Sequence, residues 1–205
     1  QVIDETKAQV GFSAVAVRAP EADGGAAILK REPRRLDLSA IAKGLGVDQI
    51  YALLDDQGYA NFLVEIGGEV RVKGDKDGLG WKIAVEKPIK GDRAVEQVLS
   101  LKNVALATSG DYRNYREIDG VAYSHTIDPS TGRPVTHQLA SVTVADSECA
   151  MADGWATALL VLGPDKGYEL AVSRKIPAMF IERSGDTFIV KQTPRFERLL
   201  AGEVE

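Results

Sequence analysis

The sequence contains little of what disulfides and soft-metal sites require. Cys149 is the only cysteine, so no internal disulfide forms. One cysteine and two histidines among 205 residues also exclude a zinc site built from thiolates, and a histidine-rich site is improbable. Any metal bound by this chain is therefore expected to be a hard cation with oxygen ligands.

Long hydrophobic runs and an excess of basic residues are also absent. The apolar run over residues 158–162 is far shorter than the ~20 residues of a membrane span. The first residues lack the basic and then apolar pattern of a secretory signal. A net charge of −5 argues against a general nucleic-acid binder, and we expect no nucleic-acid partner. With 44% apolar and 27% charged residues, the composition is that of a globular protein.

Strand-like and helix-like patterns are interspersed along the chain without strict alternation. Alternating apolar residues predict strands, and the Asp119-Gly120 pair between two such runs is a hairpin signal. Apolar residues at helical spacing predict helices, the first of them with Ser39 as its N-cap. The strands include 61–73, 81–86, 95–101 and 141–145, and the helices 39–58, 148–162 and 165–174. This organisation predicts an α+β fold with mainly antiparallel sheets and packed helices.

Two pairs of glycines interrupt these patterns. Gly44 and Gly46 would each cost the first helix about 1 kcal/mol relative to alanine, which indicates close packing or a ligand there. Gly67-Gly68 interrupts the strand pattern over 61–73, where a bulge is a more common explanation than a phosphate loop. The sequence contains neither G-x-G-x-x-G nor the P-loop motif, so the standard nucleotide-binding folds are excluded.

Asp153 and Thr157 lie four residues apart in the predicted helix 148–162. This spacing places a carboxylate and a hydroxyl on one helix face, where both could bind Mg²⁺. The alternative is an aspartate that opposes the helix dipole and a threonine on the flank. Because the surrounding residues are apolar, a lone carboxylate there would be costly without a partner.

His125 lies where a predicted hairpin strand enters the turn-forming sequence Asp-Pro-Ser-Thr-Gly. Turns beside a rigid sheet often carry catalytic groups, and an imidazole suits proton transfer near neutral pH. A histidine that is simply hydrogen-bonded to the backbone of a tight loop is the alternative.

Five segments in this order resemble the ApbE family, the FAD:protein FMN transferases. They are LDLSAIAKGLGVD (36–48), EIGGEV (65–70), TSGDYRNY (108–115), SHTIDPSTGRPV (124–135) and ADGWATALLVLG (152–163). The resemblance implies an ApbE-like flavin transferase fold, with residues 1–205 as its C-terminal core. It further implies an N-terminal region upstream that supplies part of the flavin and adenine pocket.

The resemblance also implies an activity and a set of site residues. The family transfers FMN from FAD to a threonine or serine hydroxyl of an acceptor protein, with Mg²⁺, and releases AMP. Matched position by position, Asp153 and Thr157 would be side-chain Mg²⁺ ligands, and the backbone carbonyls of Ala40 and Ala156 would complete the protein part of the metal site. Asp37, Lys43 and Ile127 would contact FAD, the last through its backbone, and His125 would activate the acceptor hydroxyl.

Two other activities remain open from the residues. Water could replace the acceptor hydroxyl, which would give an Mg²⁺-dependent FAD pyrophosphatase that releases FMN and AMP. A flavin-binding module without catalysis is the other. For the transferase, the resemblance implies an acceptor flavoprotein subunit as partner, a periplasmic location at the inner membrane, and a lipid anchor upstream of this chain.

Overall fold

The computed structural model of the protein describes residues 2–7, 9–19, 25–89, 94–110, 115–118 and 121–203. Its helices are α1 (Val2–Lys7), α2 (Ala42–Asp56), α3 (Cys149–Leu162), α4 (Pro164–Ser173) and α5 (Pro194–Leu200), and η1 (Phe12–Ala14) is a 3-10 turn. The long strands are β3 (Phe62–Ile66), β4 (Glu69–Lys73), β5 (Trp81–Glu86), β6 (Val95–Leu101), β7 (Val104–Gly110), β12 (Leu139–Asp146), β13 (Ala178–Ser184) and β14 (Thr187–Gln192). Short hairpins are formed by β1 (Val15–Arg18) with β2 (Ala27–Lys30), β8 (Tyr115–Ile118) with β9 (Val121–Ser124), and β10 (Ile127–Asp128) with β11 (Arg133–Pro134). The predicted α+β fold is confirmed.

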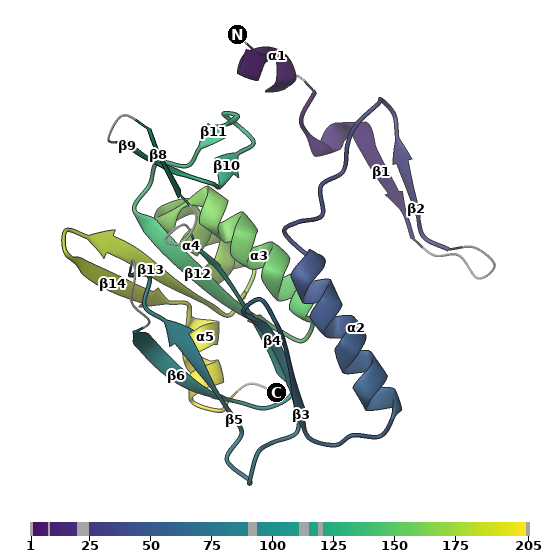
Figure 1. Ribbon diagram of the computed structural model, residues 1–205, viewed down its shortest axis with the longest axis vertical. Helices are drawn as coiled ribbons and strands as arrows, with labels where there is room; N and C mark the ends of the chain where they lie inside the picture. The colour runs from purple at the N-terminus through teal and green to yellow at the C-terminus, as the bar shows by residue number, and fades with distance from the viewer. Residues whose placement is uncertain are drawn as a thin grey trace.

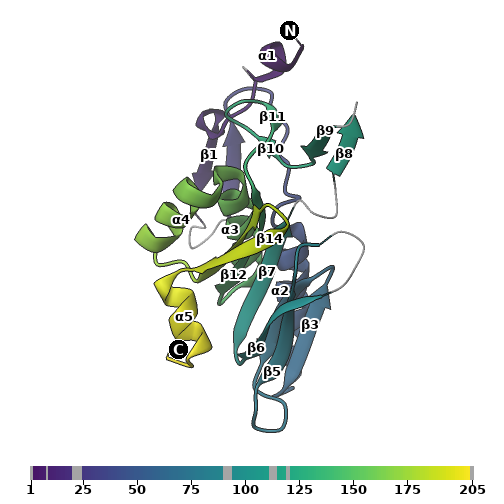
Figure 2. The same cartoon turned by 90° about the vertical axis from the view of Figure 1, so that its left-hand side faces the viewer.

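A six-stranded sheet in the order β14-β13-β12-β7-β4-β3 forms the centre of the molecule (Figure 1). Every pair of neighbours in it is antiparallel. The helices α2, α3 and α4 cover one face, whereas the β5–β6 ribbon and α5 lie against the other. In Figures 1 and 2, α1 and the β1–β2 hairpin lie together at one end, away from this sheet.

Alternation along the central strands explains the two buried layers. On β13, Ala178 and Phe180 pack toward α3 and α4, while Met179 and Ile181 pack with the β5–β6 ribbon and α5. Successive side chains of a strand point to opposite faces, so a strand covered on both sides is apolar throughout. The sheet is therefore a rigid support on which α3 and the end of β7 are fixed.

Two local predictions are wrong. Gly67-Gly68 is not a bulge but the two-residue turn of the β3–β4 hairpin, with φ of 61° and 103° and with Ile66 paired to Glu69. Positive φ at both central residues matches the right-handed twist of the strands, and glycine adopts it without strain. Ser39 does not cap α2, because its hydroxyl and amide both donate to Asp37 Oδ1 and the helix begins at Ala42.

The N-terminus of α3 is capped from another helix. Asp48 of α2 accepts hydrogen bonds from the amides of Cys149 and Ala150, at 2.9 Å each, and binds Arg71 Nη1 at 2.5 Å through Oδ1. The side chain of Glu148, the N-cap residue of α3, makes no capping hydrogen bond. The first amides of a helix have no partner within it, so Asp48 joins α2 to the start of α3.

Two further observations concern sequence-based expectations. The Asp119-Gly120 turn lies outside the described residues, although the strands on either side, β8 and β9, do pair. No helix in the described part of the chain is long and apolar enough to cross a membrane.

Candidate functional site

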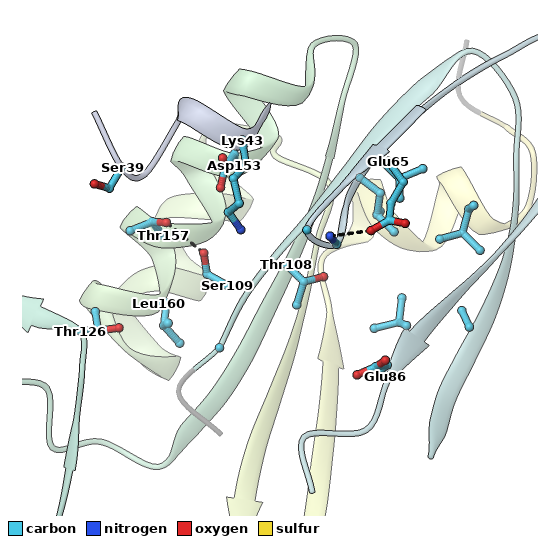
Figure 3. Close-up of a pocket in the computed structure, with 18 of the residues that line it drawn as sticks. Ser39, Lys43, Glu65, Glu86, Thr108, Ser109, Thr126, Asp153, Thr157 and Leu160 are labelled. Atoms are coloured by element: carbon cyan, nitrogen blue, oxygen red, sulfur yellow. Dashed lines mark hydrogen bonds between the residues drawn. The ribbon is translucent and has the colours of Figure 1, made fainter. Parts of the chain in front are cut away.

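A cavity of about 900 Å³ lies where the N-terminal end of α2, one face of α3, the β3–β4 turn and the end of β7 meet. The β5 residues Lys82, Ile83, Ala84, Val85 and Glu86 line its opposite wall. Among the predicted site residues, Lys43, His125, Asp153 and Thr157 line this cavity. Figure 3 shows Lys43 beside Asp153, with Thr157 further along α3 and Glu86 across the cavity.

Asp153 is a buried carboxylate with one hydrogen bond. The residue is 4% exposed, and Oδ2 accepts from the amide of Gly44 at 3.0 Å. Burial raises the pKa of Asp153, while the Gly44 bond and the charge of Lys43 oppose that rise. No other donor among the described residues reaches this carboxylate, which leaves it the capacity to bind a ligand.

Gly44 brings α2 and α3 into contact at this point. A Cβ added at Gly44 would lie 2.4 Å from the carbonyl oxygen of Cys149, closer than any real contact. The prediction of close packing at Gly44 is therefore confirmed, whereas Gly46 meets only the flexible end of Ile66. Without this close approach, the Gly44 amide would not reach Asp153.

Thr157 lies one turn beyond Asp153, and its hydroxyl is 2.9 Å from Ser109 Oγ at the end of β7 (Figure 3). A second hydroxyl pair, Thr108 with Thr143 at 2.8 Å, lies beside it on β7 and β12. A threonine that donates its proton to Ser109 keeps its lone pairs for a cation, so Ser109 can fix the hydroxyl in a ligating orientation.

The backbone before α2 offers a further oxygen. The Gly44 amide, which would bond to the Ala40 carbonyl in a continued helix, donates to Asp153 instead. In the described part of the chain, no donor reaches the Ala40 carbonyl. This observation agrees with the predicted role of Ala40, which stays a prediction.

The oxygen atoms of Asp153, Thr157 and Ala40 are ligands that suit a hard cation. Among the described residues, no three histidine, cysteine, aspartate or glutamate side chains are arranged so that they could together hold a metal ion. The available ligands near Asp153 are one carboxylate, one hydroxyl and one free carbonyl, all oxygens. Oxygen ligands of this kind are those that Mg²⁺ prefers in proteins.

Lys43 and Glu69 form an ion pair beside this site. Lys43 Nζ lies 2.6 Å from Glu69 Oε1, and the Glu69 side chain is 2% exposed against 46% for Lys43. Burial raises the pKa of Glu69, the negative charge of Asp153 raises it further, and Lys43 opposes both. Glu69 was not among the predicted site residues. Its only sequence signal is a charged residue directly after the glycine pair, where the strand pattern resumes.

Cys149 lies beneath the same charged groups and is chemically inert. It is buried, and its thiol lies 3.6 Å from the carbonyl oxygen of Val70. Burial, together with the negative charges of Asp48, Glu69 and Asp153, raises the pKa of Cys149 to about 12. A thiol with this pKa stays protonated near neutral pH, so no thiolate nucleophile is available here.

The remaining predicted residues occupy different positions. His125 is exposed and lines the cavity between β9 and β10. Asp37 is exposed outside the cavity lining, where the hydroxyl and amide of Ser39 hold its pKa below the ordinary value. Ile127 is exposed on β10, which packs against α3, and Ala156 is buried within α3. The predicted backbone roles of Ile127 and Ala156 stay predictions.

Comparisons with known proteins identify the family of this chain. The model of the ApbE family matches residues 1–180. The chain belongs to the ApbE family. It is 48% identical over 167 residues to the FAD:protein FMN transferase of Vibrio cholerae, which covers 81% of this chain and 50% of the relative. The Haemophilus influenzae FAD:protein FMN transferase is 46% identical over 166 residues, 80% of this chain and 48% of the relative.

Solved structures of the ApbE family have the same fold. The apo form of the Pseudomonas stutzeri flavinyl transferase ApbE superposes with a TM-score of 0.82 at 39% identity, over 99% of this chain and 61% of that one. The Vibrio cholerae flavin transferase ApbE gives a TM-score of 0.82 at 41% identity, over 95% of this chain and 60% of that one. These similarities confirm the predicted family and fold. The chain spans about half the length of the curated relatives it matches.

Proposed function

We propose that the protein containing this chain is an Mg²⁺-dependent FAD:protein FMN transferase, which modifies a threonine or serine of an acceptor protein and releases AMP. One observation carries the proposal. Two helices distant in sequence, α2 and α3, place Lys43, Asp153 and Thr157 at one cavity that His125 also lines. The names of the relatives supply the flavin chemistry, since they are described as FAD:protein FMN transferases.

The metal part of the site would consist of Asp153, Thr157 and the carbonyl of Ala40, with Ala156 as a further predicted carbonyl ligand. When bound, Mg²⁺ supplies charge neutralisation at the pyrophosphate during phosphoryl transfer. Asp153 offers a buried carboxylate oxygen, and Ser109 keeps the Thr157 hydroxyl oriented at 2.9 Å. The two residues thus present preorganised oxygens on a rigid helix.

The chemistry asked of the chain's own residues is positioning and proton transfer. The acceptor hydroxyl oxygen forms a bond to the phosphorus on the riboflavin side of FAD, and the bond from that phosphorus to the bridging oxygen breaks. AMP leaves with the bridging oxygen, while the hydroxyl proton passes to His125. A general base in this role typically contributes about 10²- to 10⁴-fold. Lys43 would bind the phosphate oxygens next to the metal site.

The partner follows from the proposed activity, and the location from the resemblance to the family. The acceptor would be a flavoprotein subunit that presents a threonine or serine at the open side of the cavity, near His125. We further propose a periplasmic location at the inner membrane, with a lipid anchor outside this chain. Labelled full-length protein in fractionated cells tests the location and the lipid anchor.

Intact-mass spectrometry of an acceptor domain tests the activity. Full-length protein, FAD, Mg²⁺ and a threonine-bearing acceptor are expected to add one FMN to the acceptor and release AMP. EDTA should abolish the product, and His125→Ala should slow its formation by about 100-fold or more, the usual worth of a general base.

A matched variant and a second product separate the alternatives. Thr136→Ala changes an exposed threonine outside the cavity lining and should leave the rate unchanged. Free FMN and AMP without modified acceptor would identify a pyrophosphatase instead. FAD binding without any AMP would identify a flavin-binding module.

A further inference from the structure

Glu69 is a buried charged group that the proposed chemistry does not use. The residue is 1% exposed at the start of β4, directly after the Gly67-Gly68 turn. Its Oε1 receives Lys43 Nζ at 2.6 Å, while its Oε2 is buried without a hydrogen-bond partner among the described residues. Glu69 does not line the cavity, whereas Lys43 does. The carboxylate thus lies behind the lysine, on the side away from the cavity.

The path of the lysine side chain is also fixed. A Cβ added at Gly67 would lie 3.3 Å from Lys43 Cδ and 3.8 Å from Glu69 Oε2. The stem of Lys43 therefore crosses the β3–β4 turn over a residue without a side chain and ends on the carboxylate. Lysine has a flexible stem of four carbons, and an unpaired ammonium would occupy many rotamers. With one N–H on Glu69, two others remain for a ligand in the cavity.

From this arrangement we infer that Glu69 is a positioning residue, which holds the Lys43 ammonium in place for the pyrophosphate oxygens of FAD. The inference rests on the proposed function, because it assumes that Lys43 meets FAD. It assigns to Glu69 a role through Lys43 and no contact with the substrate.

Stability does not account for this ion pair. A buried carboxylate with an unpartnered oxygen is costly, and a buried ion pair is often no better for stability than apolar residues of the same size. The same two elements, α2 and β4, are also joined at the surface by Lys73 and Asp55, both partly exposed. An exposed pair joins the elements without burying a charge. The buried position of Glu69 therefore calls for a different explanation, and control of Lys43 supplies one.

The Lys73–Asp55 pair provides a matched control. Asp55→Ala breaks a lysine–carboxylate pair between the same helix and strand, outside the cavity lining. The experiment measures FAD affinity of the full-length protein by quenching of flavin fluorescence, with Mg²⁺ and with EDTA. It compares Glu69→Ala, Glu69→Gln, Lys43→Ala, the Lys43→Ala/Glu69→Ala double variant and Asp55→Ala, and records the Tm of each.

Glu69→Ala is expected to weaken FAD binding about tenfold, in the range seen when a partner that orients a ligating group is removed. Its Tm should not fall, because the variant removes a buried charge. Glu69→Gln keeps an acceptor oxygen and should show a smaller loss, and Asp55→Ala should bind FAD as the parent does. In the Lys43→Ala background, Glu69→Ala should add no further loss.

The outcomes separate this inference from the proposed function. A parent protein that binds no FAD overturns both. Weaker binding in Lys43→Ala with unchanged or tighter binding in Glu69→Ala overturns the positioning role alone. Unchanged affinity in Lys43→Ala also overturns it, but leaves the transferase standing if AMP is still released. A Glu69→Ala variant that loses stability while its FAD affinity is kept would show a structural role.

Discussion

Asp48 and Asp153 lie at two ends of the α2–α3 contact and have reciprocal bonds. Asp48 is on α2 and accepts from the amides of Cys149 and Ala150 on α3, whereas Asp153 is on α3 and accepts from the amide of Gly44 on α2. Asp48 also binds Arg71, which in turn lies 3.9 Å from the centre of the Tyr51 ring. Asp153 receives a single hydrogen bond from the described residues and opens on the cavity.

The two aspartates therefore differ in role. Asp48 stabilises the fold, whereas the fold positions Asp153. Both oxygens of Asp48 accept hydrogen bonds from donors of the chain. Asp153 is more deeply buried, 4% exposed, yet keeps binding capacity that its surroundings do not satisfy. Buried polar groups in native proteins are normally paired, so this free capacity supports the proposed role of Asp153 as a metal ligand. Both bonds depend on the same close helix contact.

The largest loss of stability is expected from Asp48→Ala, which removes the aspartate that joins α2 to the start of α3. It leaves Arg71 without its partner and the first amides of α3 without acceptors. Losing a partly buried pair of this kind should cost about 3 kcal/mol of the free energy of unfolding, measured by urea denaturation. Asp55→Ala breaks an exposed pair from the same helix and should cost less than about 1 kcal/mol. Equal losses in the two variants would remove the distinction between the two aspartates.

A smaller loss of stability is expected from a change at Gly44, where α2 and α3 are in close contact. In Gly44→Ala, the added Cβ would lie 2.4 Å from the Cys149 carbonyl oxygen and 2.7 Å from Ala150 Cα. Because these are backbone atoms, the helices must separate, at a cost of about 2 kcal/mol. The separation also moves the Gly44 amide from Asp153, so FAD-dependent activity should fall together with stability.

Gly46→Ala is the matched control, measured by the same denaturation. Its Cβ would lie 3.2 Å from Ile66 Cδ1, the mobile end of a side chain. The gain in helix propensity, about 1 kcal/mol, should balance the small displacement. A Gly44→Ala variant as stable as Gly46→Ala would contradict the role of the close contact.

Local pattern in the sequence predicted most of the secondary structure but little of the support around the site. Helix 148–162 differs from α3 by one residue, and the predicted strand 81–86 coincides with β5. By contrast, the capping of α3 depends on Asp48, more than a hundred residues before it, which no pattern within the helix indicates.

The same limit applies within the cavity. The Asp153–Thr157 pair follows from spacing in one helix, and the structure places both at the cavity. Glu69 and Ser109 act across 26 and 48 residues, on Lys43 and Thr157. The alternation of apolar residues along a strand also does not predict that Glu69 is buried. The strand β4 begins with two consecutive buried residues, Glu69 and Val70. Contacts between elements, rather than patterns within them, decide which polar residues support a site.

The smallest change in stability is expected for Asp153→Asn, which retains an acceptor for the Gly44 amide and removes a buried charge. Since burial raises the pKa of Asp153, the ionised carboxylate destabilises the metal-free fold above that pKa. The variant should therefore be more stable than the parent at neutral pH, by about 1 kcal/mol. The folded parent binds the proton more tightly than the unfolded chain does. The difference in stability between the parent and the variant should consequently narrow as the pH falls through the raised pKa of Asp153. It should vanish below the ordinary pKa of an aspartate.

Mg²⁺ should reverse the order of the two proteins. A ligand that binds only the folded state raises Tm, so the parent should gain thermal stability with Mg²⁺ while Asp153→Asn should not. Thermal melts from pH 4 to pH 8, with Mg²⁺ and with EDTA, measure both effects. A variant less stable than the parent in EDTA at neutral pH would mean that Asp153, like Asp48, holds the fold. An equal Mg²⁺ response in the two proteins would place the cation elsewhere.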